Sequence, residues 1–204
     1  MIVGASGFAR EVHWLIERIN DKSPKWNFMG YIDSDISKEK VIGDDEFLKS
    51  NKNDLNVVIA IADPQIRKKL VTMYKKNEKL RFPNLIDPSV LMSDKNILGV
   101  GNVICAGSIL TVEIEIGNFN IINLDCTVGH EAEIKDFVTI NPSVNISGKA
   151  CLENGVSIGT GTQILQGQRI GENAVIGAGA VVTQSIPNDC TAVGIPAKVI
   201  KDRR

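Results

Sequence analysis

Two neighbouring residues in the C-terminal half of the chain could perform acid–base chemistry. The sequence contains only two histidines, and one of them, His130, is followed directly by Glu131. An imidazole changes its charge near neutral pH, so His130 could act as a general base toward an amine or a hydroxyl. Neighbouring residues on a strand point to opposite faces, so Glu131 could assist only at a corner of the chain or at a subunit contact.

The second histidine, the cysteines and the serines give no comparable indication of a catalytic role. His13 is expected on a helix beside Val12 and Trp14, where a solvated or partly packed imidazole is the simpler interpretation. The four cysteines show no C-x-x-C spacing, so we expect no metal site and no redox motif. No serine or cysteine nucleophile motif is visible. Direct attack of an acceptor on its co-substrate is therefore favoured over a covalent enzyme intermediate.

A period of six residues must position His130. Every sixth residue from Ile86 to Val182 is aliphatic or methionine, in one unbroken register. An α-helix cannot produce this pattern, because a six-residue step turns it by about 600° and the apolar stripe would leave its face. Short strands joined by tight turns fit, since three hexads close one triangular coil and successive coils stack as parallel sheets. We expect an all-β parallel β-helix of roughly five coils with its aliphatic residues inside.

The N-terminal part has a different sequence pattern, in which expected strands and helices alternate. A small parallel α/β unit of Rossmann type follows from this alternation. The first strand is short if the chain starts at Met1, so either its edge is trimmed or the true start lies upstream. We place an α/β domain at residues 1–83 and the β-helix, with a C-terminal tail, at residues 84–204. The expected elements are a strand at Ile2–Val3, a glycine turn at Gly4–Gly7, a helix at Ala9–Ile19, strands at Trp26–Asp33 and Leu55–Ala62, and a helix at Pro64–Lys79.

Composition excludes several classes of partner. The 204 residues include 23 basic and 24 acidic side chains, a net charge of −1 that provides no electrostatic footprint for nucleic acid. No apolar run approaches the roughly 18 to 20 residues that span a bilayer, and the N-terminus lacks the layout of a signal peptide. We therefore expect a cytoplasmic protein with no nucleic-acid partner and no membrane span.

Four stretches together make the chain resemble one family, the hexapeptide-repeat sugar acyltransferases. This family includes sialic acid O-acetyltransferases and N-acetyltransferases of UDP-4-amino-sugars. The resemblance implies a left-handed β-helix, a homotrimer, and transfer of acetyl from acetyl-CoA to an amine or hydroxyl of a nucleotide-activated sugar in bacterial surface glycan biosynthesis. The stretches are Gly4-Ala5-Ser6-Gly7, Tyr31-Ile32-Asp33-Ser34-Asp35, His130-Glu131 followed by Phe137-Val138-Thr139-Ile140-Asn141-Pro142, and Gly194-Ile195-Pro196-Ala197-Lys198.

The resemblance also implies roles for individual residues. His130 matches the catalytic base of the family, and Glu131 matches the glutamate that tunes it. Relatives that act on UDP-amino-sugars commonly carry histidine where Phe8 and Thr139 stand here, and glycine where Ala62 stands, so the acceptor sugar stays open. The positions matching acetyl-CoA contacts are Thr139, Thr160 and Ala178. The positions matching nucleotide-sugar contacts are Ser6, Gly7, Phe8, Asp33, Ser34 and Ala62.

Three alternatives are weighed against this interpretation. A β-helical carbonic anhydrase needs three histidines on one zinc, and this chain has two. A dinucleotide-dependent oxidoreductase fits poorly, because the G-x-G-x-x-G fingerprint is incomplete and Asp33 falls far along for a ribose-binding acid. A non-enzymatic β-helix scaffold would use the coils only for assembly. The sequence also leaves open N- versus O-acetylation, the sugar, the pathway and any acyl chain longer than acetyl.

Overall fold

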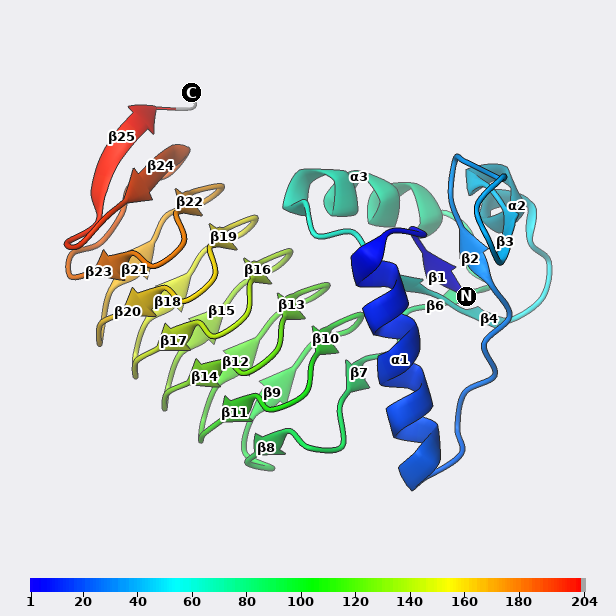
Figure 1. The fold of residues 1–204 in the computed structure, drawn as a ribbon, viewed down its shortest axis with the longest axis horizontal. Coiled ribbons are helices and arrows are strands. Elements are labelled where there is room, and N and C mark those ends of the chain that lie inside the picture. Colours follow the sequence, from blue (N-terminus) through cyan, green and yellow to red (C-terminus); the bar gives the residue numbers. More distant parts are fainter. Residues whose placement is uncertain (203–204) are drawn as a thin grey trace.

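The computed structural model describes residues 1–202, which form an α/β part and a β-helix, with the α/β part beside the first coils (Figure 1). The α/β part contains a four-stranded parallel sheet in the order β3-β2-β1-β5, as the Rossmann-type prediction requires. Helix α1 packs on one face of this sheet, and α2 and α3 pack on the other. The elements are β1 (Ile2–Val3), α1 (Gly7–Lys22), β2 (Tyr31–Ile32), β3 (Val41–Gly43), α2 (Asp45–Ser50), β4 (Leu55–Asn56), β5 (Val58–Ile59), α3 (Pro64–Tyr74) and β6 (Leu80–Arg81).

The structure corrects the predicted strand at Leu55–Ala62, which is divided between two sheets. The amide of Val57 donates to the carbonyl of Arg81, whereas the amide of Val58 donates to the carbonyl of Met1. Strand β4 therefore pairs with β6 in a separate two-stranded sheet, and only β5 joins the main sheet. The predicted strand at Trp26–Asp33 is likewise reduced to the two residues of β2.

Both predicted helices have different ends from those expected. Helix α1 runs on to Lys22, and its hydrophobic stripe buries Ala9, Val12, Leu15 and Ile16. Helix α3 stops at Tyr74 rather than Lys79. The side chain of Asn77 donates to the carbonyls of Leu48 and Asn51 there, and the chain turns back to enter β6. Helix α2 and strand β3 were not predicted.

The hexad register is confirmed over its whole length, because each predicted aliphatic is the second residue of a two-residue strand. The strands form three parallel faces of a left-handed β-helix with nearly six coils, where roughly five were expected. Face 1 comprises β7 (Leu85–Ile86), β10 (Val103–Ile104), β13 (Ile121–Ile122), β16 (Thr139–Ile140), β19 (Ser157–Ile158) and β22 (Val175–Ile176). Face 2 comprises β8 (Leu91–Met92), β11 (Ile109–Leu110), β14 (Thr127–Val128), β17 (Asn145–Ile146), β20 (Gln163–Ile164) and β23 (Val181–Val182). Face 3 comprises β9 (Ile97–Leu98), β12 (Glu115–Ile116), β15 (Glu133–Ile134), β18 (Cys151–Leu152) and β21 (Arg169–Ile170).

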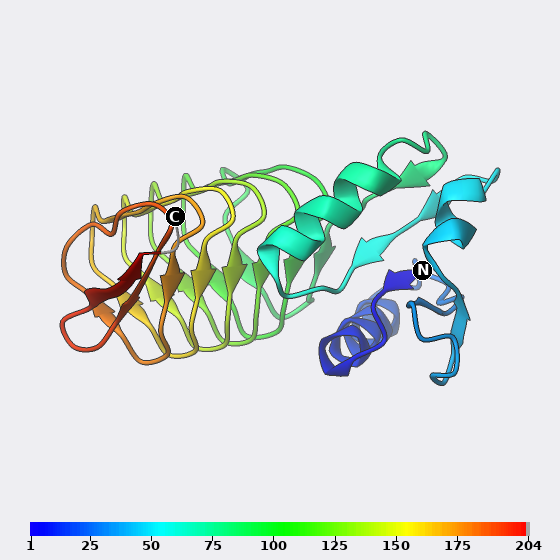
Figure 2. The same ribbon diagram turned by 90° about the horizontal axis from the view of Figure 1, so that it is seen from above.

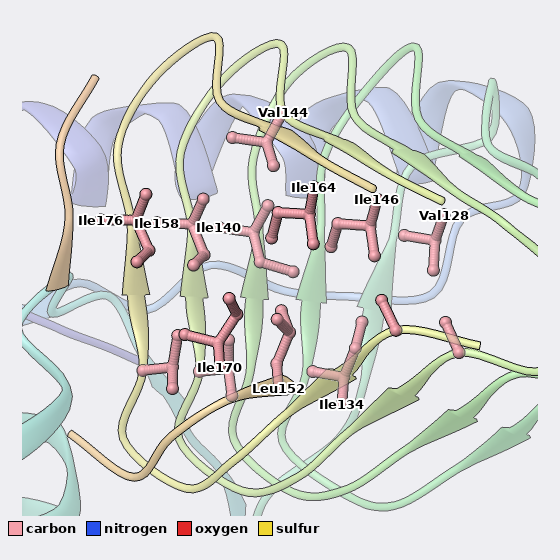
Figure 3. Close-up of a cluster of buried hydrophobic side chains, with 14 of the residues drawn as sticks. Val128, Ile134, Ile140, Val144, Ile146, Leu152, Ile158, Ile164, Ile170 and Ile176 are labelled. Atoms are coloured by element: carbon pink, nitrogen blue, oxygen red, sulfur yellow. The ribbon is translucent and has the colours of Figure 1, made fainter. Parts of the chain in front are cut away.

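The interior of the β-helix is a set of aliphatic ladders. Residues 18 positions apart pair across neighbouring coils, as Val128 does with Ile146 and Ile146 with Ile164. Figure 3 shows these side chains converging from the three faces. Burying a Val, Leu or Ile side chain contributes about 1.5 to 3 kcal/mol, so the repeated hexad supplies most of the stabilisation of this part.

The two parts share their hydrophobic cores. Helix α1 packs with Leu85, Val103 and Ile121 of face 1, and the other side of the sheet packs with Phe119 at the edge between faces 3 and 1. The N-terminal end of α3 also reaches the later coils, where Gln65 donates a hydrogen bond to Asn173 (Figure 2). The α/β part therefore lies on the side of the prism that face 1 forms.

The last coil is covered by a hairpin. Strand β24 (Cys190–Val193) continues face 1 in parallel with β22, and β25 (Lys198–Asp202) pairs antiparallel with β24. The turn between them contains the Gly194–Lys198 stretch on which part of the family resemblance depends. An added antiparallel strand covers the open sheet edge that a parallel solenoid would otherwise expose.

Candidate active site

His130 and Glu131 lie at the edge between faces 2 and 3, here called edge 2–3, in the turn from β14 to β15. Glu131 has a φ of 58°, a left-handed conformation that reverses the direction of its side chain. Oε2 of Glu131 consequently lies 2.9 Å from Nδ1 of His130. Of the two arrangements left open by the sequence, a corner of the chain and a subunit contact, the corner already brings these neighbours together.

This contact indicates which nitrogen of the imidazole is free to accept a proton. A carboxylate only accepts hydrogen bonds, so we assign the proton of the neutral ring to Nδ1, which leaves the lone pair on Nε2. The His130 side chain is 49% exposed, which leaves it accessible to a reactant. The hydrogen bond from His130 and the charge of Lys149, whose Nζ lies 3.5 Å from Oε1, hold the pKa of Glu131 below its usual value.

The predicted nucleotide-sugar residues meet at the carboxyl edge of the α/β sheet. Ser6, Gly7 and Phe8 follow β1, Asp33 and Ser34 follow β2, and Ala62 follows β5. In open α/β sheets, ligands bind at this edge beside the strand where the order of connection reverses, and here that strand is β1. The structure therefore gathers all six residues at one end of the sheet.

Asp33 ties two of these loops together. Its Oδ2 accepts a hydrogen bond from the amide of Ala5 at 3.0 Å, and its Oδ1 accepts from the amide of Asp35 and from Nζ of Lys38. Burial alone would raise the pKa of Asp33, but these hydrogen bonds outweigh burial and keep the pKa below its usual value. An ionised carboxylate at this place can accept hydrogen bonds from sugar hydroxyls.

A basic cavity of about 570 Å³ adjoins Ser6. Arg10, Lys38 and Lys40 contribute cationic side chains to its lining, against one acidic side chain, that of Glu39. His13 also lines it and is partly packed, because its ring stacks on Phe28 with 3.8 Å between centroids. The cations make the cavity suitable for an anionic group such as a diphosphate.

Ala62 and Thr139, a predicted sugar contact and a predicted cofactor contact, touch each other. Oγ1 of Thr139 donates a hydrogen bond to the carbonyl of Ala62 at 2.6 Å and accepts one from Nη2 of Arg67 at 2.9 Å. Both residues line a second cavity of about 400 Å³, with Asn141 and Ser157 also in its lining. The hydroxyl of Thr139 is thus engaged within the chain, so a hydrogen bond to a cofactor would have to replace or share these contacts.

Arg67 is a buried cation that sequence reasoning did not single out. It is 1% exposed, and besides Thr139 it donates to the carbonyls of Ile61, Ala62, Phe119, Phe137 and Val138. Burial lowers its pKa to about 9, so the guanidinium stays charged at neutral pH. Its position in a helical pattern gave no signal of this role, because the acceptors come from segments distant in the sequence.

Thr160 and Ala178 occupy equivalent places on successive coils, at the edge between faces 1 and 2, here called edge 1–2. The amide of Gly179 donates to the carbonyl of Thr160 at 2.8 Å, and the amide of Gly161 donates to that of Pro142 at 3.0 Å. Edge 1–2 therefore presents a regular column of backbone groups. Thr139 lies on the adjoining face 1 but is buried beneath the loop that carries Ala62.

His130 is separated from the other site residues of its own chain. In a three-sided coil, edge 2–3 lies opposite face 1, and face 1 carries the α/β part and the contact between Ala62 and Thr139. One chain therefore places its base on one side of the prism and its sugar-binding edge on the other.

Neither a metal centre nor a membrane segment is evident in residues 1–202. No group of three or more histidine, cysteine, aspartate or glutamate side chains in this range is arranged to hold a metal ion. None of the helices described has both the length and the apolarity that crossing a bilayer requires.

A left-handed β-helix with a histidine–glutamate pair on one edge, attached to a small parallel α/β sheet, defines a hexapeptide-repeat acyltransferase. Comparison with known proteins agrees. Residues 1–74 match the family model of the PglD N-terminal domain. The chain spans about a fifth of the length of the curated relatives it matches, which are acetyltransferases.

Solved structures resemble the whole chain. WeeI from Acinetobacter baumannii AYE is 31% identical, with 98% of each chain covered and a TM-score of 0.87. The acetyltransferase domain of PglB from Neisseria gonorrhoeae FA1090 is 25% identical, with 98% of each chain covered and a TM-score of 0.91. A mutant perosamine N-acetyltransferase from Caulobacter crescentus, in complex with CoA and GDP-perosamine, is also 25% identical, with 98% of this chain and 96% of that one covered and a TM-score of 0.91. The chain belongs to the family of hexapeptide-repeat sugar acetyltransferases, which confirms the resemblance found in the sequence.

Proposed function

We propose that this protein transfers the acetyl group of acetyl-CoA to an amine of a nucleotide-activated sugar, as a step in bacterial surface glycan biosynthesis. The observation that carries the proposal is the 2.9 Å contact between Nδ1 of His130 and Glu131, which directs a basic Nε2 to the surface. The solved relative with CoA and GDP-perosamine, named an N-acetyltransferase, supports an amine as the acceptor and a nucleotide as its carrier.

The chemistry needs one base and no covalent enzyme intermediate. Nε2 of His130 removes a proton as the sugar amine attacks the thioester carbonyl, so that a C–N bond forms and the C–S bond breaks. The proton then passes from His130 to the departing thiolate, which leaves as CoA. Glu131 stabilises the imidazolium during this interval, and Lys149 holds the carboxylate in place.

We place the nucleotide-sugar at the carboxyl edge of the α/β sheet. Asp33 and Ser34 would accept and donate hydrogen bonds to the ribose and base, and the loop of Ser6, Gly7 and Phe8 would approach the diphosphate beside Arg10. Ala62 would contact the sugar. The ionised state of Asp33 and the cations of the 570 Å³ cavity support this placement.

We place acetyl-CoA along the coils. Its pantetheine arm is extended and rich in amides, so it can hydrogen-bond to a column of backbone groups much as an added strand does. The turns at Thr160 and Ala178 stack on edge 1–2 through hydrogen bonds from coil to coil. The arm would pair with other backbone groups of these turns, such as the amide of Ala178. Thr139, on the adjoining face, would lie near the acetyl end. Since acetyl-CoA is made and used in the cytoplasm, the reaction would take place there.

The complete site is proposed to form between subunits of a homotrimer. Because edge 2–3 lies opposite face 1, His130 of one subunit would serve the sugar-binding edge and the cofactor column of its neighbour. Packing three prisms around a three-fold axis repeats this arrangement three times and closes the assembly.

A thiol-release assay tests the proposal. The protein is mixed with acetyl-CoA and with UDP-, GDP- or dTDP-linked sugars that carry either an amine or a hydroxyl at the same carbon. Free CoA thiol released only with amino-sugars is the expected result. Free sialic acid is tested as an additional hydroxyl acceptor. Release only with hydroxyl sugars would replace N- by O-acetylation, and no release with any acceptor would favour a scaffold.

A further inference from the structure

The imidazole of His130 lies against Gly148, one coil further along the same edge. A Cβ atom placed on Gly148 would lie 2.5 Å from Nε2, 2.6 Å from Cε1 and 2.9 Å from Cδ2 of His130. Real Cβ contacts are essentially never shorter than 3.0 Å, and the three nearest atoms all belong to this one ring. The ring therefore occupies the space that any side chain at position 148 would need.

The backbone does not require glycine at this position. The residue in the left-handed conformation at this turn is Lys149, with a φ of 59°, and Gly148 is not among the glycines with positive φ. A residue with a side chain could adopt the backbone of Gly148. A side chain at position 148 would therefore fit only if the half-exposed ring of His130 moved.

The following residue holds the other member of the pair. Nζ of Lys149 lies 3.5 Å from Oε1 of Glu131, and the amide of Lys149 donates to the carbonyl of His130 at 2.8 Å. Gly148 and Lys149 therefore contact the imidazole, the carboxylate and the backbone of the pair from the neighbouring coil.

We propose that Gly148 is a positioning residue for the base, a role that rests on the proposed function of His130. By carrying no side chain it lets the ring settle with Nδ1 on Glu131 and keeps Nε2, the nitrogen nearest to position 148, uncovered. A methyl group there would either cover Nε2 or rotate the ring away from Glu131. A displacement of about 1 Å in a reacting group can cost roughly 100-fold in rate.

The test compares Gly148→Ala with Gln166→Ala. Gln166 occupies the position equivalent to Gly148 in the next coil, and its side chain is exposed. Gly148→Ala should lower kcat by about 10- to 100-fold with unchanged KM values, whereas Gln166→Ala should leave kcat unaltered. Wild-type kcat in Gly148→Ala would overturn the proposal.

Nitrogen-15 NMR of the imidazoles supplies a readout that does not depend on activity. The chain has only two histidines, so a His13→Gln variant assigns both sets of signals. His130 in the wild type should show the Nδ1-protonated form, and Gly148→Ala should shift its signals while those of His13 stay in place. Unchanged His130 signals would contradict the proposal that Gly148 positions the imidazole. If His130→Ala proved fully active, the proposed base would be wrong, but these signals would still report on Gly148.

A double variant covers the case in which Gly148→Ala folds poorly. If the methyl group clashes only with the ring, His130→Ala/Gly148→Ala should recover the Tm of His130→Ala alone. A double variant that remains as unstable as Gly148→Ala would show that the methyl group clashes with the coil itself, and the proposal would fail.

Discussion

Arg67 donates a hydrogen bond from Nη2 to Oγ1 of Thr139 at 2.9 Å, and so joins helix α3 to strand β16 of the β-helix. The same hydroxyl donates to the carbonyl of Ala62, so a loop at the carboxyl edge of the sheet is held directly on face 1. The proposed sugar and cofactor regions of one subunit are therefore positioned by a single buried side chain.

Replacing Arg67 with Met should destabilise the protein strongly. The variant keeps much of the side-chain volume but leaves several buried carbonyls without a donor, at about 1 to 3 kcal/mol for each unsatisfied group. We expect a loss of at least about 3 kcal/mol in the free energy of unfolding, measured by urea denaturation. Arg81→Met, at a side chain that is 63% exposed, serves as the control and should cost little. A loss in Arg67→Met no larger than in this control would show that the carbonyls find other partners.

Acid should loosen the junction between the two parts. Asp87, 1% exposed in its side chain, accepts from Nε of Arg18 in α1 at 2.6 Å and from Ser89. Burial alone would raise the pKa of Asp87, but hydrogen bonds from Arg18 and Ser89 outweigh burial and lower the pKa to about 2. Because the pKa of Asp87 is lower in the folded chain than the unfolded value of 3.8, the ionised carboxylate stabilises the fold above about pH 4. This stabilisation is lost as the pH falls toward 2.

Unfolding in urea at a series of pH values measures this contribution. The wild type should lose on the order of 2 kcal/mol from this group between about pH 4 and pH 2. Asp87→Asn should be less stable at neutral pH and should lack this part of the acid dependence. Identical pH dependence in the two proteins would assign the effect to other carboxylates.

Removing the imidazole should abolish most of the turnover. His130→Ala should lower kcat by about 10² to 10⁴, the usual contribution of a general base. The inward Val128 is unaffected, so stability should change by less than about 1 kcal/mol. Glu131→Ala should cause a smaller fall, and Glu131→Gln, which can still accept from Nδ1, should lie between Glu131→Ala and the wild type. Near-wild-type turnover of His130→Ala with every accepted sugar would remove the proposed base.

Two inactive variants should restore activity when they share a trimer. His130→Ala keeps an intact sugar-binding edge, and Asp33→Ala keeps an intact base. If neighbouring subunits contribute these parts, randomly mixed trimers should recover about a quarter of the sites. The measurement is kcat after co-expression of the two tagged chains, with separately purified proteins mixed in the assay as the control. Absence of recovery in the co-expressed sample would place both parts in one chain.

A bulky side chain at edge 1–2 should block the cofactor. Ala178→Trp should raise the KM for acetyl-CoA by about tenfold or more, because the larger side chain would occupy space that the pantetheine arm needs. A tenfold change corresponds to about 1.4 kcal/mol of binding free energy. Binding of the nucleotide-sugar, followed by isothermal titration, should be unchanged. Met29→Trp, before β2 and away from the carboxyl edge of the α/β sheet, where the exposed fraction of Met29 is 52%, is a surface control. An unaltered KM would move the cofactor to another edge.

The sequence by itself determined which residues face the interior of the β-helix. A six-residue period assigns inside and outside without knowledge of distant contacts, because each hexad repeats the same local conformation. It also placed His130 within the repeat, but it left open whether a corner or a subunit contact brings Glu131 to the imidazole. The predicted sugar contacts could be grouped for a similar reason, since the loops after parallel strands emerge at one edge of the sheet.

Only the tertiary structure decided how these parts meet. The division of Leu55–Ala62 between two sheets, the burial of Arg67 and the engaged hydroxyl of Thr139 all depend on partners distant in the sequence. The space beneath His130 at Gly148 depends on the stacking of separate coils. The position of His130 opposite face 1 follows from the closure of three strands into a prism, together with the face on which the α/β part packs. Local periodicity carries no information about that docking, because it results from side-chain packing between the two parts.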